Sequence, residues 1–418
     1  MSKAETKPFI ISKWQFMRAF ELVKANKGAS GVDGESIADF EKDLKGNLYK
    51  LWNRMSSGSY FPPAVKGVSI PKKSGGERLL GVPTVSDRVA QMVVKLELEP
   101  VVEPHFLSDS YGYRPNKSAL DAVGTTRKRC WKYDWVLEFD IKGLFDNISH
   151  ELIVKAVEKH TPTSWVLLYI RRWLTANMQM PNKIMARRQT GTPQGGVISP
   201  LLANLFLHYV FDKWLLKHYP QIKWCRYADD GLIHCQTQQE AEHMLEILKQ
   251  RFSSCGLDMH PQKTKIVYCK DGKRTRNYEN TSFDFLGYTF RARGCKSRVG
   301  KMFTNFTPAV SRIALKSMSE KLKDLRLFNR TELSLEAIAK RLNPMIQGWL
   351  NYYGRFTRSA LYATWRLINN GLMRWARRKY KPLRKKSRRA ASNFMLKVAK
   401  HYPRLFAHWR TGMMGAFV

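Results

Sequence analysis

"WCRYADDGLIHC" (224–235) sets two aspartates, Asp229 and Asp230, side by side between two short segments rich in β-forming residues. The flanks alternate between apolar and polar residues, and the centre ends in Asp-Gly, which is a favoured turn pair. The stretch therefore predicts a β-hairpin that turns at Asp230 and Gly231. Acidic residues are common at hairpin tips, so this stretch alone favours a simple turn as much as a functional site.

A second acidic segment, "WVLEFDIKGLFDNISH" (135–150), changes that balance. An apolar strand leads to Asp140 and Ile141, and a loop and a helix follow. If both motifs belong to one sheet, Asp140 joins Asp229 and Asp230, and three like charges need a cation to neutralise them. Carboxylate oxygens suit Mg²⁺, and two such ions about 4 Å apart would activate a 3′-hydroxyl and stabilise the leaving pyrophosphate. The two motifs together predict metal-assisted nucleotidyl transfer.

The charge of the chain points to a polyanionic partner. Lys and Arg number 72 against 34 Asp and Glu, so the formal net charge is +38. Such self-repulsion has no structural advantage for an enzyme, and nucleic acid is the usual reason for it, although a merely basic, ribosome-type protein is the alternative. An apolar fraction of 44% in 418 residues indicates a globular protein with two or three modules, not a disordered one.

The cysteines and the apolar pattern predict a cytoplasmic protein. None of the six cysteines forms a C-x-x-C pair, which argues against a zinc ribbon and a disulfide framework. Thiols in a reducing compartment are the simpler interpretation. No apolar run reaches the roughly 18 residues of a membrane helix, and none stands at the N-terminus.

Periodicity divides the chain into regions. Residues 1–60 are predicted to be mostly helical, with a Gly- and Ser-rich loop at 26–36. From about 64 to 290, short β-type runs alternate with helical stretches, which predicts an α+β core with a mostly antiparallel sheet, and 270–280 is predicted to be a loop. Apolar residues at helical spacing predict a helical bundle beyond about 310.

The C-terminal region carries half of the net charge. Glu336 is the last acidic residue, and the 82 residues after it contain 19 Lys or Arg. A solvated helix face is the alternative, but a one-signed face interleaved with Trp and Tyr suits a phosphate backbone and its bases better. The predicted nucleic-acid-binding residues are Arg374, Arg377, Arg378, Lys379, Lys381, Arg384, Lys385, Lys386, Arg388 and Arg389.

Nine motifs, two of them within the segments described above, are spread along nearly the whole chain. They are GASGVDG (28–34), SIPKKSGGERLLGVPTVSDRVAQ (69–91), YGYRPNKSALDAV (111–123), FDIKGLFDNI (139–148), TGTPQGGVISPLLANLFLH (190–208), YADD (227–230), LDMHPQKTKI (257–266), FDFLGYTF (283–290) and LNPMIQGWLNYYGRF (342–356). Each is weak alone, but in this order the set resembles the bacterial group II intron reverse transcriptases, also called maturases. The resemblance implies an RNA-directed DNA polymerase with a right-hand fold that uses two Mg²⁺ ions.

The resemblance assigns roles to the three acids. Asp140 and Asp229 would hold both Mg²⁺ ions, with help from the carbonyl of Ile141. Asp230 would be the third catalytic acid, bound less directly.

The resemblance also implies nucleotide-binding cations. Lys72 and Arg78 would clamp the incoming triphosphate, because a migrating charge needs fixed cations, and Lys66 is a weaker candidate for the same role. Without the resemblance, they are basic residues near a turn in a very basic protein.

Two further motifs would contact the nucleotide and the nucleic acid. Phe145 would exclude a 2′-hydroxyl by steric clash, although an ordinary core Phe is the alternative. Gln194 would lie over the nucleotide, and Gly195 and Gly196 would allow close approach of template or primer.

The family divides into domains that carry over by position. Residues 1–60 would be an RNA- and template-binding extension, 61–300 the fingers and palm, 301–375 the thumb or maturase domain, and 376–418 a basic DNA-binding segment. The implied partners are group II intron RNA, an RNA template with a DNA or RNA primer, target DNA and dNTPs, for a monomer or homodimer. Many relatives end in a Cys-rich endonuclease. Its pattern is missing here, so a nick or a replication fork would supply the primer.

Other functions stay open at this point. A splicing-only maturase predicts decay of the metal ligands, but all three acids are present. A domesticated reverse transcriptase in DNA repair or phage defence fits the same motifs. An RNA-dependent RNA polymerase would share the fold, and Phe145 argues against it.

Overall fold

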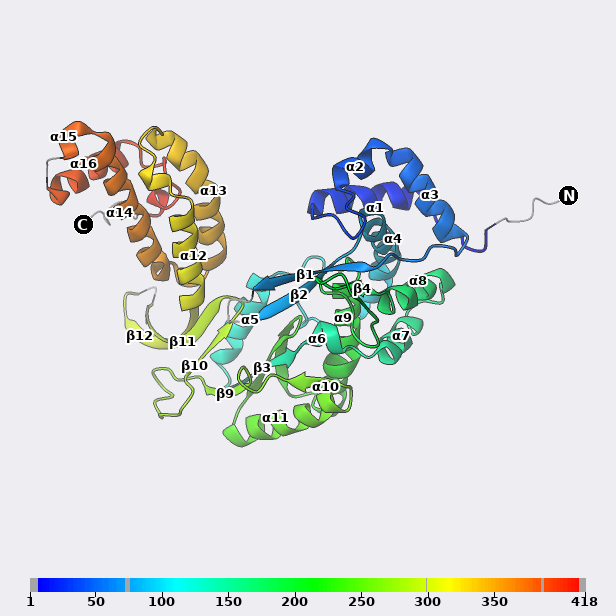
Figure 1. Cartoon of the computed structure of the whole chain (residues 1–418). Coiled ribbons are helices and arrows are strands. Elements are labelled where there is room, and N and C mark those ends of the chain that lie inside the picture. Colours follow the sequence, from blue (N-terminus) through cyan, green and yellow to red (C-terminus); the bar gives the residue numbers. More distant parts are fainter. Residues whose placement is uncertain (1–6, 72–75, 298, 385–386, 413–418) are drawn as a thin grey trace. The chain divides into compact units, whose positions relative to one another are not determined.

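The computed structural model describes residues 7–71, 76–297, 299–384 and 387–412 (Figure 1). Helices and sheets are mixed along the chain, which confirms the α+β class. The chain forms two compact units, each described here by itself. Unit 1 comprises Met1–Ala122 and Leu137–Lys265, and unit 2 comprises Val123–Val136 and Ile266–Val418.

The N-terminal part of unit 1 is helical, as predicted. Residues 27–36 between the first two helices contain no helix or strand, so the predicted loop is confirmed. Ser36 and Asp39 form a capping box at the second helix, and the Phe20 and Phe40 rings stack at 5.6 Å. The helices are α1 (Lys13–Asn26), α2 (Ile37–Lys42), α3 (Leu44–Ser56) and α4 (Val85–Val102).

Unit 1 contains two sheets, with strand orders β2-β1-β4-β5 and β6-β7-β3-β8. The pairs β1–β2, β4–β5, β6–β7 and β3–β8 are antiparallel and β1–β4 is parallel, which agrees with a mostly antiparallel arrangement. The strands are β1 (Val65–Pro71), β2 (Glu77–Val82), β3 (Trp135–Lys142), β4 (Met178–Gln179), β5 (Met185–Ala186), β6 (Lys223–Tyr227), β7 (Asp230–Cys235) and β8 (Asp258–Met259).

The other helices of this part pack apolar faces into the core. In α9, eight of the nine residues are buried, and α11 buries one stripe that includes Leu248 and Phe252. The helices are α6 (Leu144–Asn147), α7 (His150–Glu158), α8 (Ser164–Leu174), α9 (Ser199–Leu207), a π-helix (His208–Asp212), α10 (Lys213–His218) and α11 (Gln238–Ser253), while α5 (Ala119–Cys130) begins in unit 1 and lies mostly in unit 2.

Unit 2 contains a three-stranded sheet of order β10-β11-β12. Alternation along its strands puts aromatic residues on one face, where Phe283 stacks on Phe290 at 4.7 Å and lies 6.0 Å from Phe306. The strands of this unit are β9 (Lys265–Tyr268), β10 (Ser282–Phe285), β11 (Tyr288–Lys296) and β12 (Met302–Val310).

A helical bundle follows, as predicted beyond 310. Its core includes Ile338, Leu342, Trp365 and Leu372, all fully buried. The helices are α12 (Arg312–Asp324), α13 (Leu335–Tyr353), α14 (Tyr362–Lys379), α15 (Lys381–Arg384) and α16 (Arg388–His401).

Two of the expected domain boundaries, which stay predictions, fall within packed parts of unit 2. The boundary at 375/376 falls inside α14, and Met395, Phe406 and Trp409 belong to the same buried core as the bundle. The boundary at 300/301 falls between β11 and β12, which pair along their whole length. Helices and strands thus pack together on both sides of these two positions.

Two expectations about the chain as a whole can be compared with the structure. None of the six cysteines, all in the described part, forms a disulfide. Among the helices of the described residues, none is both long and apolar enough to cross a membrane.

Candidate functional site

The hairpin that carries the paired acids turns two residues earlier than predicted. Tyr227 pairs with Asp230, so Ala228 and Asp229 form the turn and Gly231 lies within β7. A Cβ at Gly231 would lie 2.1 Å from Cζ of Phe139 on the neighbouring strand, so the glycine serves packing rather than the turn. Ala228 instead adopts a φ of 56°, a strained conformation for a residue other than glycine.

The side chain of Arg226 stabilises this strained turn through a set of buried hydrogen bonds. Its guanidinium is fully buried and pairs with both carboxylate oxygens of Asp212, at 2.8 and 2.7 Å. The same group donates to Oδ1 of Asn204 and the carbonyl of Ala228, both at 3.1 Å, and to Oγ of Ser110 at 2.9 Å. Burial acts to raise the pKa of Asp212, but Arg226 outweighs it and the pKa is lowered. The pair is therefore ionised.

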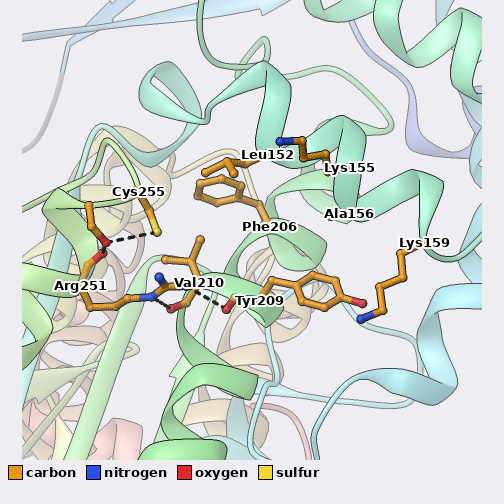
Figure 2. Close-up of a pocket in the computed structure, with 10 residues that line it drawn as sticks. Leu152, Lys155, Ala156, Lys159, Phe206, Tyr209, Val210, Arg251 and Cys255 are labelled. Carbon is orange, nitrogen blue, oxygen red and sulfur yellow. Dashed lines mark hydrogen bonds between the residues drawn. The ribbon is translucent and has the colours of Figure 1, made fainter.

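A π-helix places Asp212 under the hairpin. Such wide turns leave carbonyls that need other donors. Figure 2 shows Arg251 of α11 supplying them, with bonds to the carbonyls of Val210 (2.9 Å) and Tyr209 (3.4 Å). The cavity that these residues border, about 390 Å³, contains none of the predicted site residues. Arg251 thus stabilises the π-helix that ends at Asp212.

A segment before α5 also closes on the hairpin. The N–H of Arg226 donates to the carbonyl of Asp109 and its carbonyl accepts from Tyr111, each at 2.9 Å. A Cβ at Gly112 would lie 2.4 Å from the nitrogen of Ala228, so this close approach requires glycine.

Tyr113 extends this segment toward the acids. Its ring lies 6.5 Å from that of Tyr227, and burial followed by the charge of Asp229 raises its pKa. A polar aromatic side chain thus stands beside the turn.

Asp140 lies next to the hairpin, because β3 and β7 are neighbours in the sheet. Only 7% of Asp140 is exposed, and its Oδ2 accepts from Nζ of Lys263 at 2.6 Å. The contact with Asp140 is the main reason that the pKa of Lys263 is raised. Ile141 follows Asp140 in β3 and is 2% exposed.

The three acids repel one another electrostatically. Burial and then Asp140 raise the pKa of Asp229, and Arg78 and Lys263 offset only part of this. Asp230 keeps contact with solvent, yet surrounding protein atoms, Asp229 and Asp140 raise its pKa to about 7. The site carries more negative charge than its own cations neutralise.

The donor chemistry fits a divalent cation, although the side chains are not gathered around one. Within the described residues, no three His, Cys, Asp or Glu side chains are close enough to form a ready-made metal site. Mg²⁺ binds hard carboxylate oxygens and stabilises their ionised form, which burial and mutual repulsion disfavour at Asp229 and Asp230. A cation at Asp140 would meet Lys263, whose Nζ already lies 2.6 Å from Oδ2 of Asp140.

The structure brings two of the predicted nucleotide-binding residues together. Arg78 donates to Oε1 of Gln194, whose amide donates to Oδ2 of Asp146 at 3.1 Å. Lys66 lies in β1 opposite Val82, without a bond to this group in the described structure. Lys72 lies outside the described residues.

Phe145 and the two glycines take structural positions. Phe145 is 8% exposed, and its carbonyl accepts from the N–H of Thr192 at 2.6 Å. A Cβ at Gly195 would lie 2.4 Å from the carbonyl oxygen of Gly81, and one at Gly196 would lie 2.5 Å from Oγ of Ser199. Internal packing therefore explains these glycines, and their contact with nucleic acid stays a prediction.

The basic residues of the C-terminal region belong to α14–α16. Lys379 donates to the carbonyl of Leu333 at 2.7 Å, and Arg388 donates to Oδ1 of Asn370 at 3.2 Å. In the described part of this region, no ion pair joins them to an acid. Lys385 and Lys386 lie outside the described residues, and the described members of the set are Arg374, Arg377, Arg378, Lys379, Lys381, Arg384, Arg388 and Arg389.

Sequence reasoning missed four residues of this site. Arg226, Asp212 and Tyr113 were not singled out, and Lys263 stood in a motif without a role. An arginine inside an apolar strand was a usable signal, because a buried guanidinium needs an acid. The identity of that acid depends on the fold.

Two known sequence families match large parts of this chain. The family described as reverse transcriptase (RNA-dependent DNA polymerase) matches residues 70–290. The family described as group II intron, maturase-specific domain matches residues 315–393.

Three known proteins show how far the similarity extends. Protein YkfC of Escherichia coli (strain K12) is 29% identical over 324 residues, which cover 68% of this chain and 81% of YkfC. Group II intron-encoded protein LtrA of Lactococcus lactis subsp. cremoris is 34% identical over 202 residues, 48% of this chain and 33% of LtrA. An uncharacterized 91 kDa protein in the cob intron of Schizosaccharomyces pombe is 31% identical over 212 residues, 48% of this chain and 25% of that protein. The chain thus spans most of YkfC and a third or less of the two intron proteins.

Proposed function

The chain belongs to the reverse transcriptase family and carries the maturase-specific domain of group II introns, and we propose that it copies RNA into DNA with two Mg²⁺ ions and binds its intron RNA. Unit 1 would supply the fingers and palm of a right-hand polymerase. The helices after residue 311 would supply the thumb.

The observation that carries this proposal is the cluster of acids on adjacent elements. Asp140 on β3 and Asp229 at the hairpin tip repel each other. The buried guanidinium of Arg226 bonds to the carbonyl of Ala228 and so stabilises the strained turn at the tip. Mg²⁺ at these carboxylates would supply charge neutralisation for the attacking hydroxyl and the leaving pyrophosphate. The buried ion pair keeps the tip in place, and Asp230 adds negative charge beside it.

The nucleotide would lie beside the group formed by Arg78 and Gln194. Arg78 is an exposed guanidinium whose only bond in the described structure is to Gln194, so it is available to a triphosphate. Lys66 and Lys72 would assist, and Phe145 would exclude ribonucleotides.

Unit 2 would bind intron RNA through its cationic helices. One cavity of this unit, about 230 Å³, is bordered by Lys323, Arg326 and Arg374. Cationic side chains without acidic partners displace the counter-ions that surround RNA phosphates. The release of these ions favours RNA binding. Binding of target DNA by 376–418 and splicing or retrohoming in a living cell belong to the same proposal.

Primer extension on an RNA template with Mg²⁺ and dNTPs tests the polymerase assignment. Asp229→Ala should lower the rate about a thousandfold or more, because the metal ions lose a ligand. Asp324→Ala, which removes an exposed carboxylate from α12, is the matched control and should extend primers at the wild-type rate. RNA binding by Asp229→Ala should stay close to wild type.

Two outcomes would contradict the proposal. Extension by Asp229→Ala near the wild-type rate would remove the metal-ligand role. A wild-type chain that binds intron RNA but extends no primer would favour a splicing-only maturase.

The same assay with rNTPs and Phe145→Ala tests the steric gate, and unchanged rNTP use would remove that role.

A further inference from the structure

Lys263 stands directly on a proposed metal ligand. Its Nζ lies 2.6 Å from Oδ2 of Asp140, and the two side chains are 57% and 10% exposed. The loop that carries Lys263 follows β8. It is held to β3, the strand of Asp140, because the N–H of His260 donates to the carbonyl of Asp140 at 2.8 Å. The fold therefore positions the ammonium of Lys263 beside the carboxylate of Asp140.

The contact is the closest charge compensation that the acids receive. In the described part of the chain, no ion pair within 4.0 Å joins Asp229 or Asp230 to a cation. Arg78 acts on Asp229 only at longer range. Without Mg²⁺, Lys263 is thus the cation that lowers the repulsion within the cluster.

The Lys263 contact can open at little cost. Breaking a fully buried pair leaves a desolvated charge, but more than half of the Lys263 side chain already meets water. A lysine has a flexible stem and a strongly hydrated head, so its ammonium can move into solvent. A neighbouring pair, Lys265 with Glu138 at 3.3 Å, is more buried on the lysine side, at 36%.

We propose that Lys263 is a built-in counter-ion that occupies Asp140 before Mg²⁺ binds and leaves it when Mg²⁺ arrives. The inference rests on the proposed metal site. An ammonium and a metal ion compete for the same Oδ2, so Lys263 lowers the apparent affinity for Mg²⁺. In return, it stabilises the metal-free fold.

Thermal unfolding in Mg²⁺ titrations tests the competition without measuring catalysis. The full chain is freed of metal with EDTA and titrated with MgCl₂ at constant ionic strength, which matters for a chain of net charge +38. Lys263→Gln should unfold at a lower temperature than wild type in EDTA. Its half-saturating Mg²⁺ concentration should be about fivefold lower than that of wild type, because the competing cation is gone.

Three variants complete the design. Lys265→Gln removes a lysine from the same segment and should keep the wild-type Mg²⁺ midpoint. Lys263→Arg keeps the charge and should also keep a midpoint close to wild type. Asp140→Asn should abolish the Mg²⁺-dependent gain in melting temperature.

The outcomes separate this inference from the proposed function. If Lys263→Gln shows the wild-type midpoint or a weaker one, while Asp140→Asn abolishes the gain, the counter-ion role is wrong and the metal site stands. If wild type gains no stability from Mg²⁺, or the gain survives in Asp140→Asn, the metal site fails and the counter-ion role fails with it.

Discussion

In unit 1, Arg226 and Asp212 form a fully buried ion pair, whereas in unit 2 Asn369 bonds to His408 and Trp409 without any charge. Both networks are almost completely shielded from water. The first supports a strained hairpin tip that carries repelling acids, and the second closes the core of a helical bundle. The charged network gives directional, strong bonds where the backbone is strained, at the risk of a large loss if one partner is removed. The neutral network contains no charge, so its burial costs little as long as its hydrogen-bond donors have acceptors.

Breaking the charged pair should have the largest effect. Arg226→Met leaves Asp212 buried and unpaired, which should destabilise unit 1 by about 3–5 kcal/mol. Primer extension should fall with it, because Ala228 loses a bond that holds the turn. Urea unfolding followed by hydrogen exchange in peptides of unit 1 measures the change.

A double variant, Arg226→Met with Asp212→Leu, is the control for this effect. Removing both charges should recover much of the lost stability, but it should not restore primer extension. A double variant as unstable as the single one would contradict the account of an unpaired buried charge.

Changing the pH should move the two units in opposite directions. Burial lowers the pKa of His408 to about 3, so unit 2 is fully stabilised above about pH 6.5 and loses stability as the pH falls, by about 1.4 kcal/mol per unit. Asp230 has its pKa raised to about 7, so its contribution favours the folded state at low pH and is lost as the pH rises from about 4 to 7.

Hydrogen exchange at pH 8 and pH 5, in EDTA and corrected for intrinsic rates, separates these contributions. Peptides of unit 2 should open more at pH 5, and those around the hairpin should open less. Asp230→Asn should remove the change around the hairpin, and His408→Gln the change in unit 2. Parallel shifts of both units would show that neither group controls the pH response.

A pair of glycine substitutions should give the smallest effects. Gly231→Ala puts a methyl group 2.1 Å from the ring of Phe139 and should destabilise unit 1 by about 1–3 kcal/mol. Gly348→Ala, in the middle of α13, meets no atom within 4 Å and should stabilise unit 2 by about 0.5–1 kcal/mol. Melting curves of both variants check the sign, and a stabilising Gly231→Ala would show that the strands separate easily.

Much of the fold was readable from local sequence. The loops at 26–36 and 270–280 are confirmed, because Gly, Ser and other polar residues signal them locally. The region beyond 290 was harder: β11 and β12 continue to Val310, and their pattern carries a mixed face instead of a clear alternation.

The site illustrates the same limit. Asp140 and Asp229 were found from motifs, but the turn was placed at Gly231 because local propensity favours Asp-Gly there. The contact that decides the matter is with Phe139, which lies on a strand far away in sequence. Partner choice for Arg226 depends on the fold in the same way.

The contacts that hold the hairpin also determine when it can form. The bond from Arg226 to Ser110 closes a loop of 116 residues, and the pair of Lys263 and Asp140 closes one of 123. Closing such loops costs chain entropy before any contact repays it, whereas helices such as α13 form from neighbouring residues. We therefore expect the polymerase centre to assemble late in folding, after the basic helices that we propose to bind RNA. With that binding, a refolding chain would hold its nucleic acid before it can copy it.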